Sequence, residues 1–335
     1  MKLIVRMAAV SLAFLGLAPT QSFAEVSEVR IMHTYALPSM SHYVVQDLAL
    51  IQKHAKALGL GDIAVKIERV VSGQIANDVL LSGNTDIIGS SMGPLLTLWD
   101  KTTGAQKVRG MLGLAVFSCD LMTVDPKINS LSDYGPDDRI AMANVKTSTQ
   151  AIILQMEAAK KYGWEERFRY DPLMVAMSGA DAAAALVSGK FEVKSDMNTV
   201  PFTYIEAQAG ARAIFKSKDF FGRMISATLI YTTEDFKAKN PTVYRAVVDA
   251  YEEAGEYIKA NRREAAEIYN RHEPQKQGVE FVEQLLDQKE AFQFSSTPAG
   301  FEEIADYMHK SGLLRNRLDS WKDAFFDNVW DKDGN

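Results

Sequence analysis

The chain has 335 residues, enough for about two domains, and its 47% hydrophobic and 24% charged residues are typical of a folded globular protein rather than a disordered or fibrous one. Its formal net charge is −6 and it has no strongly basic stretch, so nucleic-acid binding through Lys and Arg at phosphates is not expected. The single cysteine, Cys119, excludes an internal disulfide, a CxxC redox motif and a cysteine-rich zinc site.

The first 24 residues have the pattern of a cleavable signal peptide. Lys2 and Arg6 are followed by an apolar run of about a dozen residues, a helix-breaking proline and small residues ending at Ala24. The apolar run is shorter than the ~20 residues of a membrane-spanning helix. We therefore expect cleavage before Glu25 and a mature, acidic protein that is soluble in the periplasm.

Strand and helix patterns alternate from residue 28 to about residue 232. A short apolar strand at 29–33 precedes a periodic helix at 42–58, and an alternating strand at 63–71 precedes a short helix at 76–82. A strand at 86–90 is then followed by a helix over 93–99. This order predicts an α/β protein with mostly parallel sheets.

The pattern changes after residue 232. Residues 233–272 are almost wholly helical in pattern, and further helices are predicted at 278–289, 299–311 and 320–328. We expect them to form a C-terminal helical layer on the first half of the protein.

An internal repeat suggests two lobes of one design. Ser72-Gly73, Leu80 to Gly83 and Asp86-Ile87 recur without a gap 106 residues later as Ser178-Gly179, Leu186 to Gly189 and Glu192-Val193. The repeat predicts that each lobe presents equivalent loops. With crossovers near 117–121 and 225–230, the first lobe would comprise 25–116 plus 226–335, and the second 117–225.

The strongest enzymatic motif is Gly89-Ser90-Ser91-Met92-Gly93, which matches the G-x-S-x-G nucleophile elbow between a strand and a helix. A hydrolase would also need a downstream histidine, and the candidates His272 and His309 lie in charged helical segments. The sequence has no H-E-x-x-H, no phosphate-binding G-x-x-x-x-G-K-[ST] and no G-x-G-x-x-G motif. We therefore expect no metal and no cofactor, and an exported serine hydrolase using Ser91 stays a secondary hypothesis.

Small hydroxyl residues stand at several predicted strand-to-helix turns. Helix N-termini favour anions, and ligands of α/β sheets bind beyond the carboxyl ends of the strands. The turns therefore predict a site for a small anionic group. The residues concerned are Ser39, Ser41, Ser90, Ser91, Thr147, Ser148 and Thr149.

The chain resembles the periplasmic substrate-binding proteins of nitrate/sulfonate/taurine-type ABC importers. The matching segments are VRIMHTYALPSMSHYVV, LLSGNTDIIGSSMGPLL, ALVSGKFEVKSDMNTVPF and YTTEDFKAKNPTVYRAVVDAYEEA, which together with their order cover nearly all of 28–325. The same domain is similar to the thiamine-pyrimidine synthases, but these need a cysteine-rich stretch and this chain has only Cys119. The resemblance implies a type II binding-protein fold, whose two lobes are joined by two crossover segments and close on a ligand.

By position, the resemblance implies a ligand site drawn from both lobes and from the crossover, with no catalytic residue. Its residues would be Tyr35, Ser39, His42, Ser90, Ser91, Met92, Phe117, Ser118, Thr147, Ser148, Thr149, Asp196 and Asn198.

The expected ligand is a small organic anion, a sulfonate or a carboxylate, although these loops lack the arginine that several anion binders of the family use. Lys146 and His42 are the nearby cations. A nitrogen heterocycle such as a pyrimidine precursor is the competing ligand, because Asp196 can accept from an ammonium or a ring N–H. The implied partners are an ABC permease and its ATPase, and we expect the protein to be a monomer.

Overall fold

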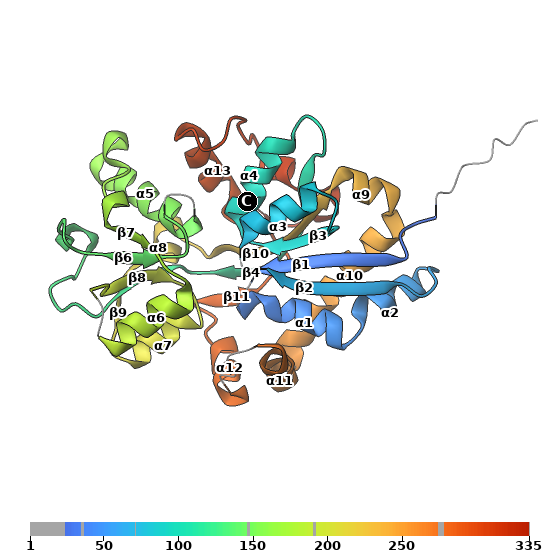
Figure 1. The fold of residues 1–335 in the computed structure, drawn as a ribbon, viewed down its shortest axis with the longest axis horizontal. Helices are drawn as coiled ribbons and strands as arrows, with labels where there is room; N and C mark the ends of the chain where they lie inside the picture. Colours follow the sequence, from blue (N-terminus) through green and yellow to red (C-terminus); the bar gives the residue numbers. More distant parts are fainter. Residues whose placement is uncertain are drawn as a thin grey trace, which may run out of the picture.

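The computed structural model describes residues 24–34, 37–70, 72–145, 148–189, 192–273 and 278–334. The predicted signal peptide therefore lies almost wholly outside the described residues. Figure 1 shows two α/β lobes side by side, each built around its own sheet. None of the helices in the described segments is long and apolar enough to span a bilayer.

The sheet of the first lobe has six strands in the order β11-β4-β10-β3-β1-β2. Strand β1 pairs in parallel with β2 and with β3, whereas β10 is antiparallel to both β3 and β4. The strands are β1 (Glu28–Thr34), β2 (Ala64–Val70), β3 (Ile87–Ser90), β4 (Val108–Phe117), β10 (Ile225–Thr233) and β11 (Phe292–Phe294).

The sheet of the second lobe repeats this plan with five strands in the order β7-β6-β8-β5-β9. Strand β6 is parallel to β7 and β8, and β5 runs antiparallel between β8 and β9. The strands are β5 (Asp120–Thr123), β6 (Ile140–Met142), β7 (Met174–Ala176), β8 (Ser195–Asn198) and β9 (Arg212–Lys216). The prediction of a two-lobed α/β fold is thereby confirmed.

The chain passes between the two sheets twice, from β4 to β5 and from β9 to β10. The strands that arrive from the other lobe are β5 in the second sheet and β10 in the first. Each of them runs antiparallel to its neighbours in its sheet. The carboxyl ends of the parallel strands β1 and β3 therefore face the second lobe, as do those of β6 and β8 with respect to the first lobe (Figure 1).

Helices cover both faces of the first sheet (Figure 1). Helices α3 and α4 pack on one face, and α1, α2, α10 and α11 pack together on the other. The helices are α1 (Met40–Asp47), α2 (Leu50–Ala57), α3 (Gly73–Leu81), α4 (Met92–Thr102), α5 (Thr149–Tyr162), α6 (Gly179–Ser188), α7 (Phe202–Gln208), α8 (Ser217–Phe221), α9 (Glu234–Lys239), α10 (Pro241–Ala260), α11 (Arg262–His272), α12 (Val279–Leu286) and α13 (Phe301–Lys310).

Two expectations about helices need correction. The helix predicted over 42–58 is divided into α1 and α2, because Ala49 has a left-handed backbone conformation with φ 49°. The helix predicted over 320–328 consists of two short 3₁₀ turns, Trp321–Ala324 and Asp327–Val329. Periodicity alone does not show such interruptions, since the apolar positions continue across them.

The C-terminal helices contact both lobes rather than the first lobe alone. In α13 the Tyr307 hydroxyl donates to Gln155 of α5 at 3.2 Å, and the ring of Tyr307 lies edge-on to Trp164. In α12, Gln284 accepts a hydrogen bond from the Tyr204 hydroxyl of α7. The helical layer therefore reaches across the boundary between the lobes.

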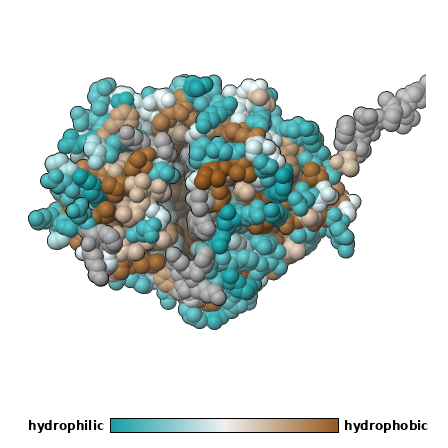
Figure 2. Space-filling model, viewed as in Figure 1, coloured by the Kyte–Doolittle hydropathy of each residue, from teal (hydrophilic) through white to brown (hydrophobic). Residues whose placement is uncertain are grey.

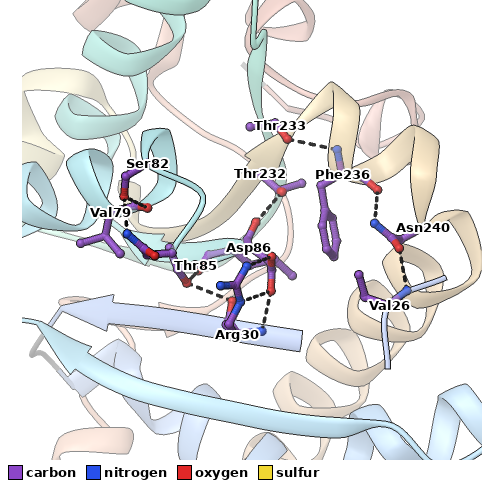
Figure 3. Close-up of polar contacts among 12 residues, drawn as sticks. Val26, Arg30, Val79, Ser82, Thr85, Asp86, Thr232, Thr233, Phe236 and Asn240 are labelled. Carbon is purple, nitrogen blue, oxygen red and sulfur yellow. Dashed lines mark hydrogen bonds and ion pairs between the residues drawn. The ribbon is translucent and has the colours of Figure 1, made fainter. Parts of the chain in front are cut away.

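The acidic residue of the first repeat, Asp86, directly precedes β3, and Figure 3 shows its polar contacts with neighbouring strands. Its carboxylate accepts from the Arg30 guanidinium at 2.7 and 3.0 Å and from the Arg30 backbone N–H at 2.8 Å. Its carbonyl accepts from the Thr232 hydroxyl at 2.6 Å. Asp86 thus ties β1, β3 and β10 together.

We expect Asp86→Ala to lower the free energy of unfolding by about 1.5–3 kcal/mol, because it removes hydrogen bonds that involve charged groups. Chemical denaturation would measure the loss. The matched control is Asp235→Ala, whose partner Lys239 is four residues away on an exposed helix face and should contribute at most ~0.5 kcal/mol. Equal losses in both variants would contradict the role assigned to Asp86.

Candidate ligand cleft

A cleft of about 970 Å³ lies between the lobes and takes lining residues from both sheets. Figure 2 shows the surface hollowed along the boundary between the two lobes. Thr34 and Ser90 end strands of the first sheet at the cleft, and Asp196 and Asn198 belong to the corresponding strand of the second. The cleft therefore lies where the topology of two facing α/β sheets places a ligand.

Within the described residues, four helices of eight or more residues begin at the cleft, two in each lobe, and the shorter α7 also begins there with Pro201 and Phe202. Residues in the first turn or cap of α3, α4, α5 and α6 all line it. Three of these helices have a serine cap: the hydroxyls of Ser72, Ser148 and Ser178 accept from the backbone N–H three residues ahead at 3.2–3.3 Å. Ser91, which precedes α4, makes no such capping bond. The positive ends of four helix dipoles thus point to one space.

The internal repeat contributes matching residues to the two walls. Ser72 and Gly73 line one side, and Ser178 and Gly179 line the other. A Cβ on Gly73 would lie 2.3 Å from the Ser90 hydroxyl oxygen, so the glycine lets α3 begin directly against the end of β3. These four residues were not among the predicted site residues, although the repeat itself was the signal that could have identified them.

Most of the predicted site residues lie on this cleft. Those that line it are Ser90, Ser91, Phe117, Ser148, Thr149, Asp196 and Asn198. Two others, Tyr35 and Thr147, lie outside the described residues, as does Lys146. Four predicted residues are instead turned into the protein interior: Ser39, His42, Met92 and Ser118.

His42 is the clearest departure from expectation. Its ring is fully buried in α1, stacks on His33 at 4.4 Å between ring centroids and contacts the Tyr251 hydroxyl through Nδ1 at 2.5 Å. Burial, together with the neighbouring His33, holds the pKa of His42 well below its ordinary value. His42 is therefore a neutral core residue and supplies no cation to the cleft.

The other three departures also have local causes. The Ser39 hydroxyl donates to the Thr34 carbonyl at 2.6 Å, and the Ser118 hydroxyl donates to the Asp120 carboxylate at 2.6 Å. Met92 faces the core from the first turn of α4 with no exposed surface. Each of these side chains therefore makes its contacts within the protein interior rather than in the cleft.

Beneath the cleft surface of the second lobe lies a pair of buried carboxyl groups. Asp196 and Glu206 are close enough to interact directly, and burial raises the pKa of both. The negative charge of Asp196 raises the pKa of Glu206 further. At neutral pH the pair therefore holds one proton and one negative charge between its two carboxyl groups.

Among the described lining residues the ionisable side chains are acidic or phenolic, and none is Lys, Arg or His. Besides Asp196, Glu273 contributes a carboxylate, which accepts from the Tyr43 hydroxyl at 2.8 Å and pairs with Arg69 at 3.7 Å. Polar side chains that sequence reasoning missed complete the lining, among them Gln74, Asn144, Gln150, Thr199 and Thr228. Within the described part of the lining, the positive potential that would hold an anion therefore comes from backbone N–H groups.

Comparison with solved structures identifies the fold as that of the periplasmic binding proteins. The periplasmic aliphatic sulphonate-binding protein of Escherichia coli matches with a TM-score of 0.69 and 15% identity, over 90% of this chain and 93% of that chain. The periplasmic nitrate-binding protein of Synechocystis matches with a TM-score of 0.69 and 15% identity, over 91% of this chain and 88% of that one.

Residues 139–265 match the sequence model of the family described as NMT1/THI5 like. This segment contains most of the second lobe and runs into α11. None of the curated proteins compared matches the chain in sequence. The resemblance predicted from the sequence, to nitrate- and sulfonate-binding proteins, is confirmed at the level of the fold by these matches.

Proposed function

We propose that the protein is the periplasmic solute-binding component of an ABC importer, and that it binds a small organic anion, a sulfonate or a carboxylate, in the interlobe cleft. The observation that carries this proposal is the convergence of the N-termini of α3 and α4 from one lobe and of α5 and α6 from the other on one cleft. Such termini stabilise an anionic group through free N–H donors and through their dipoles.

The delivery step would follow from the two-lobed fold. A ligand that contacts both lobes stabilises the closed arrangement over the open one, in proportion to its differential affinity for the two. A membrane permease that recognises the closed form, with its ATPase, would then receive the ligand. Export by the predicted signal peptide would place the protein in the periplasm. The sulphonate- and nitrate-binding proteins of similar fold support this reading.

The alternative of a serine hydrolase has less support. Ser91 has an ordinary extended backbone with φ −83°, and the hydrogen bonds of the described residues include none between Ser91 and a histidine. A nucleophilic serine needs a base within hydrogen-bond reach. The similar structures reported above are binding proteins.

The proposed function predicts that Ser91→Ala weakens binding without destabilising the protein. The Ser91 hydroxyl lines the cleft but caps no helix, so its loss should cost roughly 10–150-fold in affinity for an anionic ligand and little in melting temperature. A thermal-shift screen of sulfonates, carboxylates, nitrate and pyrimidines would first supply the ligand, since ~100 Kd of ligand adds about 2.7 kcal/mol of stability. Calorimetric titration would then compare the variants.

The matched control is Ser188→Ala, at the exposed C-terminal end of α6, away from the cleft. Ser148→Ala should differ from both, because it loses a helix cap and thus about 0.5–2 kcal/mol of stability in addition to any affinity. If Ser91→Ala and Ser148→Ala leave the affinity for every bound anion unchanged, the proposed anion site is wrong.

A further inference from the structure

A second cavity lies outside the interlobe cleft, where α10 ends, α11 begins and β11 follows α12. Its volume is about 300 Å³, at the lower end of the ~300–1,000 Å³ that is typical of small-molecule sites. We call it the β11 pocket, and its lining residues are Ile258, Lys259, Arg262, Leu286, Lys289, Phe292, Gln293 and Phe294. Of these described residues only Phe292 also lines the cleft, so the β11 pocket is a separate cavity that adjoins it.

The floor of the β11 pocket is apolar. Its aliphatic and aromatic side chains are only 1–9% exposed, and they are Ile258, Leu286, Phe292 and Phe294. The two phenylalanine rings lie edge to face with 5.0 Å between their centroids. Since an apolar cavity of ~150 Å³ holds a benzene ring, the β11 pocket has room for a medium-length alkyl chain or a substituted ring.

The opening of the β11 pocket is cationic. Lys259, Arg262 and Lys289 line it, and none of the described lining residues is Asp or Glu. The last turn of α10 and the first turn of α11 meet here, so their dipoles oppose each other and the side chains decide the sign of the potential. In a protein of net charge −6, this cavity therefore favours an anion. The cleft differs, because its described lining has no Lys, Arg or His.

The strand that forms the floor is attached to the first crossover. Phe292 of β11 pairs with Phe117 of β4, which lines the cleft, and the Ala291 carbonyl accepts from the Ser118 backbone N–H at 2.9 Å. Figure 1 shows β11 near the boundary between the lobes, with α11 and α12 below it. A molecule in the β11 pocket would therefore rest on a segment that is joined to the connection between the lobes.

We propose that the β11 pocket binds a small amphiphilic anion, a carboxylate carried by an alkyl chain or a single ring. Its apolar part would lie against Phe292 and Phe294, and its carboxylate would lie at Arg262 and Lys289. Both parts are needed for recognition. A short hydrophilic anion would leave the apolar floor uncovered, and an amphiphilic cation would be repelled by the basic side chains. This second site does not depend on the function proposed for the cleft.

The test is calorimetric titration of the full mature protein with octanoate, butanoate and octylamine. We expect octanoate to bind about 10-fold or more tightly than butanoate, because its additional methylene groups leave water. We expect a similar or larger preference for octanoate over octylamine, because only the carboxylate can form charge-assisted hydrogen bonds with the cations.

A double variant, Lys259→Gln with Lys289→Gln, locates the site. Both lysines are exposed, so the melting temperature should be unchanged, while the affinity for octanoate should fall about 10-fold. The matched control is Lys101→Gln, which removes an exposed lysine in the last turn of α4 that lines neither cavity and should leave the affinity unchanged.

Ser91→Ala separates this site from the cleft, because Ser91 lines only the cleft and the substitution should not affect binding in the β11 pocket. If Ser91→Ala weakens octanoate binding and the double lysine variant does not, octanoate occupies the cleft, and the inference is wrong while the anion-binding function stands. Equal affinities for octanoate and octylamine would show that the cations play no part and would overturn the inference. It also fails if octanoate does not bind, whatever the screen finds for the cleft.

Discussion

Replacement of Gly89 by alanine is expected to destabilise the first lobe by about 1–3 kcal/mol, as overpacking of a well-filled core does. The new Cβ would lie 2.4 Å from two ring atoms of His42 and 3.1 Å from the Cβ of His33. Neither histidine is free to move aside, because His42 is fully buried between the ring of His33 and Tyr251. The loss would be measured by chemical denaturation.

The same measurement on a double variant isolates the cause. His42→Ala alone leaves a cavity and costs stability, but it also removes the ring that the new methyl group would strike. The variant Gly89→Ala with His42→Ala should therefore be more stable than the sum of the two separate losses predicts. Gly104→Ala is the control, since a Cβ there meets nothing within 4 Å. Additive losses would show that the strain lies elsewhere.

The second large effect concerns alkaline pH. Burial and the charge of Asp196 raise the pKa of Glu206 to about 9. A carboxyl group whose folded-state pKa is raised contributes stability that is complete below its unfolded pKa, near 4.3, and is lost as pH rises through the folded value. The contribution of Glu206 should therefore decrease as the pH rises towards about 9, and the protein should lose stability above about pH 6.5, where the buried His33 and His42, whose pKa values are lowered, no longer oppose this trend. A shift of two pKa units alone would correspond to about 2.7 kcal/mol.

Glu206→Gln should flatten this dependence. The glutamine amide keeps a hydrogen-bond donor next to Asp196 but has no proton to lose, so the variant should be the more stable protein at pH 9 by at least ~2 kcal/mol. Thermal or denaturant unfolding between pH 5 and 9 would measure the difference, with Glu192→Gln as the exposed control. Parallel profiles for Glu206→Gln and the unmodified protein would contradict the shared-proton pair.

The chain order of strands and helices was predictable because short-range patterns determine it. Apolar runs such as 86–90, each followed by a polar turn and a periodic segment, give the βα units, and the gapless 106-residue repeat indicates two copies of the unit. The antiparallel strands β5 and β10, which are inserted between parallel neighbours, were not predictable in this way, because their pairing is non-local.

The site was predictable only where a residue's position in its turn decides its environment. Ser91 and Ser148 stand at helix starts, and such starts face the cleft. His42 and Met92 lie in the first turns of helices α1 and α4. Successive side chains on a helix are rotated by about 100°, so a difference of one position decides whether a side chain faces the cleft or the core. Asp196 was identified as a group that can accept from a nitrogen donor, but its partner Glu206 lies in another element and carried no sequence signal.

The contact between α13 and α5 restricts how the lobes can move. Tyr307 and Gln155 join the C-terminal layer to the second lobe at a place remote in sequence from both crossovers. A rigid-body rotation preserves an interlobe contact only when its axis passes close to that contact. The two connecting segments, which also have to stay intact, already lie near any such axis. The Tyr307–Gln155 hydrogen bond is therefore kept during the motion if it lies near the hinge axis, and otherwise has to break before the lobes separate.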